Sequence, residues 1–249
     1  MLVNKYGAYI YIKDNENNTL LHIGAMSGNL TTPLLLFSKE YNIDIQNNKG
    51  ETPLHKACIQ YRYKKEGTID RLLKRGANIN AQDNEGNTPL INLSRTTLNE
   101  DNVIFLINQG ADINKPNYKG ETPLIIACKY GKEKVVKVLV DYGADINKQD
   151  NEEYTPIFIA CRFSRTGINI IDYLLSKKAD LNIPNNEGET PIFELCRFKS
   201  EYIVNVFIEN GAKINIKNNN GDTPLKMGYL YNKYVINCLI DHGAKYYIE

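Results

Sequence analysis

Apolar residues recur along this chain at helical spacing, in pairs of short segments that return every 33–36 residues. One copy spans residues 122–151. The apolar face of its first predicted helix consists of Leu124, Ile125, Ala127 and Cys128. The buried side of its second predicted helix consists of Val135, Val136, Val138, Leu139 and Val140. Polar residues then predict an extended segment and a turn, so each unit should be helix, short turn, helix and protruding turn.

A Thr-Pro-apolar triplet begins each copy, and every residue in it has a physical role. Thr can accept hydrogen bonds from the first free helical N–H groups, and Pro at the first helical position lacks an N–H that would go unpaired. The triplets are Thr52-Pro53-Leu54, Thr88-Pro89-Leu90, Thr122-Pro123-Leu124, Thr155-Pro156-Ile157, Thr190-Pro191-Ile192 and Thr223-Pro224-Leu225, preceded by the degenerate Thr19-Leu20-Leu21-His22. Seven tandem units are therefore predicted.

A Gly-Ala pair forms a second marker and lies 12 residues before most of the Thr residues. Gly supplies the left-handed conformation that ends a helix, which a residue with a Cβ resists. Lys178 replaces this Gly in one unit, and Glu153 stands where another unit should have a turn Gly. We expect strained or locally rearranged backbone at both sites.

These markers resemble the ankyrin repeat. Residues 52–57 match its T-P-L-H-x-A pattern in full, and residues 143–147 match its G-A-D-V-N pattern apart from one aliphatic exchange. The resemblance implies an all-α fold, an ankyrin-repeat solenoid of stacked helix-turn-helix units with protruding β-turn or hairpin loops. It covers residues 1–249 as a single ankyrin repeat domain, with 1–13 as the remnant of a preceding repeat. The repeat starts are predicted near Asp14, Asn47, Asp83, Asn117, Asp150, Asn185 and Asn218.

Composition argues against several classes of function. The net charge is +1, so we expect no nucleic-acid partner, and no apolar run is long enough to span a membrane. The five Cys and three His form no metal-binding or catalytic pattern, so we expect no metal, no cofactor and no enzyme activity. Four Cys share one small, buried repeat position, which favours core packing and a cytoplasmic or other reducing compartment. Cys238 is expected to be more accessible.

Candidate binding residues occupy positions that the scaffold does not dictate. The seventh and eighth residues after the repeat Thr should face a concave groove near the ends of the first helices. Three consecutive units carry a cation followed by an aromatic residue there, and such residues are enriched in protein interfaces. The predicted partner-binding residues are Tyr118, Lys129, Tyr130, Tyr154, Arg162, Phe163, Arg197, Phe198 and Tyr231. The alternative is that Phe163 and Phe198 fold down between the helices as additional core.

The leading function is thus a non-enzymatic, monomeric module that binds a partner protein on its concave face. One alternative is a nucleotide or single-stranded nucleic-acid sensor that uses the aromatic and cationic row. Another is the repeat region of a larger multidomain protein. Asn114, Asn147 and Asn182 resemble sites of asparaginyl hydroxylation in ankyrin repeats, although a structural role in the turn is the simpler interpretation.

Overall fold

The computed structural model of the protein describes residues 12–30, 42–59, 66–96, 100–163, 168–198 and 201–245. Across those ranges the regular elements are helices, and the one β-type feature is an isolated bridge between Lys13 and Thr19. The all-α prediction is therefore confirmed. Of the repeat remnant predicted at 1–13, residues 1–11 lie outside the described residues.

The first helix of each repeat begins one residue after the repeat Thr. These helices are α2 (Leu20–Ser27), α4 (Pro53–Ile59), α6 (Pro89–Thr96), α8 (Pro123–Lys129), α10 (Pro156–Phe163), α12 (Pro191–Phe198) and α14 (Pro224–Tyr231). The second helices are α5 (Glu66–Lys74), α7 (Asp101–Asn108), α9 (Glu133–Asp141), α11 (Ile168–Ser176), α13 (Glu201–Glu209) and α15 (Ile236–Asp241), the last preceded by the 3-10 turn η1 (Lys233–Val235).

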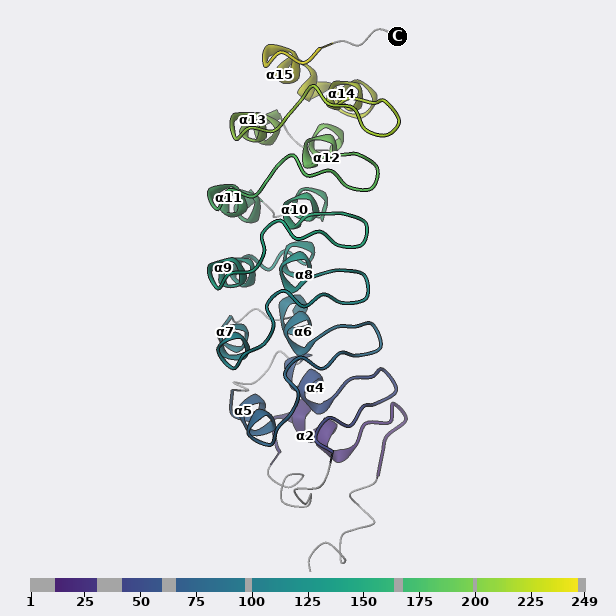
Figure 1. Ribbon diagram of the computed structural model, residues 1–249, viewed down its shortest axis with the longest axis vertical. Coiled ribbons are helices and arrows are strands. Elements are labelled where there is room, and N and C mark those ends of the chain that lie inside the picture. Colours follow the sequence, from purple (N-terminus) through teal and green to yellow (C-terminus); the bar gives the residue numbers. More distant parts are fainter. Residues whose placement is uncertain are drawn as a thin grey trace, which may run out of the picture. The chain divides into compact units, whose positions relative to one another are not determined.

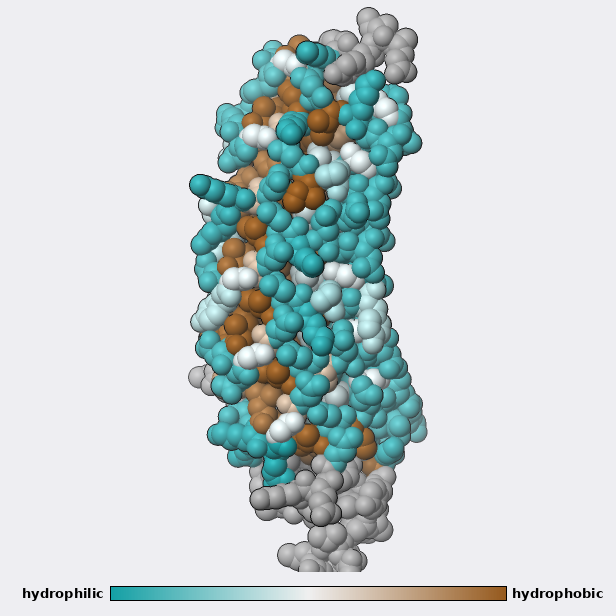
Figure 2. All heavy atoms as spheres, viewed as in Figure 1, coloured by the Kyte–Doolittle hydropathy of each residue, from teal (hydrophilic) through white to brown (hydrophobic). Residues whose placement is uncertain are grey.

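The chain divides into two compact units. The first consists of Met1–Ala127 and Lys134–Ala144, and the second of Cys128–Glu133 and Asp145–Glu249. Within each unit, successive first helices pack on one another and the second helices form a layer beside them (Figure 1). The apolar core lies between these layers, and on the face seen in Figure 2 the turn tips are largely hydrophilic.

The repeat Thr caps the first helices as predicted. In α14 the Thr223 hydroxyl accepts the backbone N–H of Lys226 at 3.2 Å, and in α8 the Thr122 hydroxyl accepts that of Ile125 at 3.3 Å. Thr190 departs from this pattern, because its buried hydroxyl has no hydrogen-bond partner in the part of the chain that is described.

The Gly-Ala marker closes the second helices. Gly76 has φ 86°, and the N–H of Ala77 donates to the carbonyl of Leu72 at 3.1 Å, which is the bond made around a left-handed helix end. Ala77 itself is buried, which accounts for the small second residue of the marker. Lys178 adopts the same conformation with φ 60°, so the strain predicted there is confirmed.

Buried helix faces follow the predicted pattern with one correction. Val135, Val136 and Leu139 are buried in α9, whereas Val138 and Val140 are only half-buried. At 3.6 residues per turn these two side chains lie on the flanks of the helix and not on its buried face.

The cysteines are buried and free of disulfides, as predicted for the four that share a repeat position. Burial raises the pKa of the Cys196 thiol to about 12. The prediction that Cys238 is more accessible is wrong, because its side chain is only 4% exposed. It lies in α15 with its Sγ 4.0 Å from Oδ1 of Asn205 in α13, so the neighbouring second helix covers it.

Each protruding turn is built around an Asp or Asn side chain that binds its own backbone. Oδ1 of Asp83 accepts the N–H groups of Glu85 at 2.9 Å and Asn87 at 2.8 Å. The same pair of bonds is made by Asp14, Asn47, Asn117, Asp150, Asn185 and Asn218. Every turn tip therefore has the same shape.

Adjacent tips within a unit are joined by a ladder of backbone hydrogen bonds. The N–H of Asn84 donates to the carbonyl of Lys49 at 2.9 Å, and the N–H of Tyr118 donates to that of Glu85 at 3.0 Å. This ladder leaves little space beside Gly86, because a Cβ built there would lie 2.6 Å from the Tyr118 nitrogen.

Glu153 shows what a side chain does at this crowded position. It has φ 61°, which confirms the predicted strain. The N–H of Asn186 lies 3.3 Å from the carbonyl of Glu152, the residue before Glu153. The N–H of Asn219 lies 3.0 Å from the carbonyl of Glu187, the residue before Gly188. A Cβ is thus accommodated with a longer contact between the tips.

A second set of bridges starts from the Asn residues that follow the Gly-Ala marker. Oδ1 of Asn147 accepts the N–H of Asp180 at 2.9 Å, and Oδ1 of Asn182 accepts the N–H of Lys213 at 2.8 Å. The structural role expected for these Asn residues is therefore present, but their side chains bind the next repeat and not their own turn.

Both marker histidines connect successive repeats. Nδ1 of His55 accepts the N–H of Thr52 at 3.1 Å, so Nε2 carries the proton and donates to the carbonyl of Asn87 at 2.9 Å. His22 repeats the arrangement and reaches the carbonyl of Glu51 at 2.9 Å. Burial lowers the pKa of both imidazoles.

Gly86→Ala should destabilise the protein more than Gly76→Ala. Both positions have a positive φ, 80° and 86°, so each Ala has left-handed strain of about 1–2 kcal/mol. Only the Cβ at 86 meets the neighbouring tip, and overpacking of this kind adds about 1–3 kcal/mol. Chemical denaturation of the two variants measures the difference, and equal losses would show that the neighbouring tip moves freely.

The free energy of unfolding should fall as the pH drops below about 6.5, the ordinary pKa of His. Because the pKa of His22 and His55 is lower in the folded protein, the unfolded chain binds more protons below that pH. Stability from the neutral imidazoles is complete above that pH and is lost as the pH falls toward their folded pKa. Urea titrations between pH 7.5 and 5.5 measure this loss.

His55→Gln separates these imidazoles from other titrating groups. It should be less stable than the wild type at pH 7.5 but should lose less stability on acidification. Identical pH slopes for His55→Gln and the wild type would contradict the assignment.

Candidate functional site

Four aromatic side chains occupy one repeat position in the second unit and are exposed. They lie eight residues after the repeat Thr, at or just beyond the C-terminal ends of the first helices. Their exposed fractions are 49% for Tyr130, 48% for Phe163, 67% for Phe198 and 62% for Tyr231. The alternative that Phe163 and Phe198 are core residues is therefore wrong. We call these four residues the aromatic row.

The helices hold the row on a buried base. In α10, Ala160 and Cys161 are fully buried three and two residues before Phe163, respectively. In α12, Leu195 and Cys196 are buried in the same way before Phe198. Since these first helices pack on one another, the aromatic residues project from a fixed scaffold.

Arg162 belongs to a small cluster of rings. Its guanidinium donates a hydrogen bond to the Tyr154 hydroxyl at 2.8 Å and lies 5.3 Å from the centre of that ring and 5.7 Å from that of Phe163. Lys129 Nζ lies 5.8 Å from the Phe163 ring, which is the range of a cation–π contact. Four predicted residues, Lys129, Tyr154, Arg162 and Phe163, are thus brought together.

Tyr154 does not lie on an exposed turn tip as predicted. Its side chain is 8% exposed, and its ring packs on Phe158 with 4.8 Å between centroids. The turn folds back against the first helix at this residue, so the buried Tyr154 accepts a hydrogen bond from Arg162 and holds its guanidinium in place. It is a positioning residue for this surface.

Arg197 is held by the scaffold. Two of its guanidinium nitrogens donate to Glu189 at 2.6 and 2.5 Å, and this carboxylate also accepts from Asn218 Nδ2 at 2.9 Å. The hydrogen bond to Glu189 raises the pKa of Arg197, and Glu194 lies 3.7 Å away. The positive charge of Arg197 is therefore neutralised on the protein.

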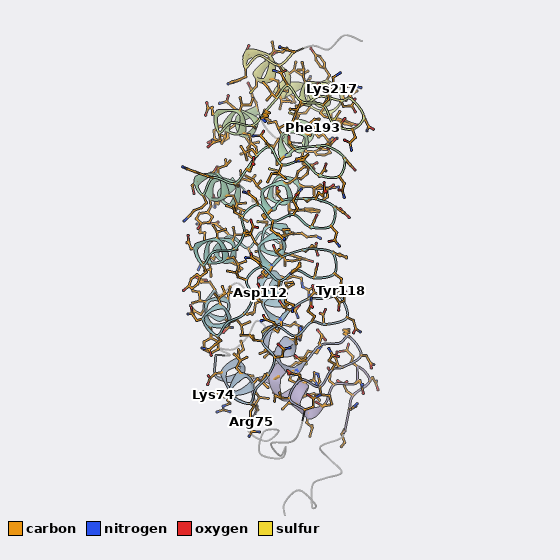
Figure 3. All side chains as sticks on the ribbon, in the orientation of Figure 1. Lys74, Arg75, Asp112, Tyr118, Phe193 and Lys217 are labelled. Atoms are coloured by element: carbon orange, nitrogen blue, oxygen red, sulfur yellow. The ribbon has the colours of Figure 1, made fainter. Side chains whose placement is uncertain are left out.

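Tyr118 lies in the first unit, at the tip of the turn before α8, and is 65% exposed (Figure 3). Its ring passes over Gly86 of the preceding tip, whose missing Cβ would come within 2.6 Å of it. Tyr118 is thus an exposed aromatic residue on an ordered turn, separate from the aromatic row.

Sequence reasoning missed several exposed apolar residues of the second unit. They are Tyr202, Tyr229, Leu230 and Tyr234. Tyr229 gave a readable signal, because it replaces the small residue found at this position in the other repeats, such as Cys196. The others occupy helix starts and ends, where periodicity does not distinguish buried from exposed residues.

Groups for other chemistry are not assembled in the described ranges. There, no three His, Cys, Asp or Glu side chains are placed to bind a metal ion. A search of the same residues for a helix long and apolar enough to cross a membrane finds none.

Phe198→Ala and Phe193→Ala, two changes in α12, should lower stability by very different amounts. Phe193 is fully buried, so its truncation should lower the free energy of unfolding by about 3–5 kcal/mol. Phe198 is 67% exposed, so the loss should stay within about 0.5 kcal/mol, as for other surface changes. Thermal and urea unfolding test this. A large loss of unfolding free energy for Phe198→Ala would show that Phe198 is part of the core.

Comparisons with known proteins agree with this architecture. A family model described as ankyrin repeats (3 copies) matches residues 1–83, 21–117, 61–150, 98–185 and 157–249, which together span the chain. The comparison with curated protein sequences found no match. Among solved structures, the chain is similar to the ankyrin repeat domain of Bcl-3, described as a unique member of the IkappaB protein family, with a TM-score of 0.75 and 26% identity over 91% of this chain and 100% of that chain.

Ankyrin repeat domains are generally protein–protein interaction modules and are typically non-catalytic. The family match, the Thr-Pro and Gly-Ala markers at their structural positions and the repeated turn tips all lead to one assignment. The chain belongs to the ankyrin repeat family.

Proposed function

We propose that this protein is a non-enzymatic module that binds a partner protein through the aromatic row of its second unit. The observation that carries the proposal is that Tyr130, Phe163, Phe198 and Tyr231 are all about half exposed or more at one repeat position, while the residues two and three positions earlier in α10 and α12 are buried.

Exposed rings on a rigid base are suited to binding. Large aromatic side chains contribute much apolar contact area at a small loss of conformational entropy, and they are frequent hot spots of interfaces. Phe163, Phe198 and Tyr231 come from α10, α12 and α14, which pack on one another, so these side chains are arranged before the partner arrives. We propose that this row lies on the concave face, as the resemblance to ankyrin repeats implies.

Charge favours a protein over a nucleic acid as the partner. A phosphate backbone is bound by a series of cations along one track. The charge of Arg197 is neutralised by Glu189, and the next repeat has Leu230 at the equivalent position in place of a cation. The five buried, free cysteines support our further proposal that the protein works in a reducing compartment.

Affinity capture from native lysate with the full chain as bait tests the proposal. Proteins retained by the wild type and identified by mass spectrometry should be lost with the double variant Phe163→Ser, Phe198→Ser. Loss of two hot-spot residues of about 2 kcal/mol each would weaken a complex by roughly a thousandfold.

Tyr142→Ser is the matched control, since Tyr142 is also an exposed aromatic residue but follows the second helix α9. It should retain the same proteins as the wild type. Capture that is unchanged by the double variant and lost with Tyr142→Ser would move the binding surface to the second helices.

A further inference from the structure

Arg162 and Arg197 occupy the same repeat position but differ in charge compensation. Each donates hydrogen bonds to the residue eight positions earlier in the chain. For Arg197 this residue is Glu189, a carboxylate bound through two nitrogens. For Arg162 it is Tyr154, a neutral phenol that accepts one hydrogen bond at 2.8 Å. Tyr154 therefore holds the guanidinium in place without neutralising it.

No carboxylate of the described residues forms an ion pair with Arg162. Its contacts are the Tyr154 hydroxyl and the faces of the Tyr154 and Phe163 rings, and the residue is exposed. A guanidinium that is hydrogen-bonded to a buried tyrosine and lies within cation–π range of two rings has already lost much of its rotational freedom. It can therefore bind an incoming anion at a low entropic cost.

Phe163 places an exposed apolar surface directly beside this charge. The ring centroid is 5.7 Å from the Arg162 guanidinium carbon and 5.8 Å from Lys129 Nζ, and the side chain is 48% exposed. A ligand complementary to this pair presents a negative group next to an apolar one. Two planar N–H donors of Arg match a carboxylate in a bidentate arrangement.

We propose that Arg162 and Phe163 bind an acidic segment of the partner protein. A carboxylate of the segment pairs with the Arg162 guanidinium, and a neighbouring apolar side chain covers the Phe163 ring. This inference rests on the proposed function and adds the chemistry of the partner. Phosphate of a nucleic acid is disfavoured, because the equivalent cation in the next repeat, Arg197, is already paired with Glu189.

Selection of phage-displayed random dodecapeptides on the immobilised full chain tests the inference. Bound peptides should be enriched in Asp and Glu placed within a few residues of Phe, Leu or Ile. Synthetic peptides from the selection should bind Arg162→Gln about tenfold more weakly than the wild type, the loss expected for one charge-assisted pair. The same peptides should bind more weakly at high salt.

Two further variants isolate the charge. Tyr154→Glu should neutralise Arg162 as Glu189 neutralises Arg197 and should weaken acidic peptides by a similar factor, whereas Tyr154→Phe keeps the ring and should weaken them less. Lys177→Gln, just after α11, is the matched control, because it removes one positive charge outside the site, beside Tyr173, and should leave binding unchanged. Thermal unfolding confirms that each variant is folded.

Each outcome decides between the possibilities. Peptides that depend on Phe163 but show no acidic enrichment, or that bind Arg162→Gln as tightly as the wild type, would overturn this inference and leave the proposed function standing. A selection with no Phe163-dependent peptide would count against both. Arg162-dependent binding of a single-stranded oligothymidylate that displaces the peptides would assign the site to phosphate and overturn the acidic-segment proposal.

Discussion

The hydrogen-bond ladder between adjacent turn tips sets the geometry on which the rest of the stack depends. Within each compact unit, every tip after the first donates a backbone N–H to a carbonyl of the tip before it, as Asn84 does to Lys49. Since adjacent tips in a unit share this backbone hydrogen bond, a change in hairpin length would move its N–H or its carbonyl out of register. This is the physical reason for the 12-residue interval between the Gly-Ala marker and the repeat Thr. The differences in repeat length fall between Thr and Gly, outside the ladder.

Close packing of the first helices follows from the same spacing. The residues five and six positions after the Thr lie where helices such as α10 and α12 meet, and they are small or medium side chains such as Ala160 and Cys161. The residues immediately after them leave the contact. These positions can therefore hold large side chains such as Phe163 and Phe198. A binding surface can vary there without a change in the scaffold.

Buried polar groups connect the repeats. Their burial costs little free energy because nearly all of them have hydrogen-bond partners. His55 bonds to its own cap and to the next repeat, and Glu189 holds both Arg197 and Asn218. A hydrogen-bonded, paired group avoids most of the cost of burial. Tyr154 takes the place of Glu189 one repeat earlier, and this one exchange leaves a positive charge on the surface of the second unit.

Sequence alone determined the local features of the protein. The Thr-Pro and Gly-Ala markers predicted where helices begin and end, and the absence of Gly at Glu153 and Lys178 predicted strain there. These features could be predicted because caps and left-handed residues depend on neighbours within a few positions in the chain. The tertiary structure decided the rest. Tyr154 is buried because the turn folds back on α10, and Cys238 is covered by α13. Whether Phe163 and Phe198 entered the core was likewise open until the helices were packed, since periodicity gives the direction of a side chain but not what lies opposite it.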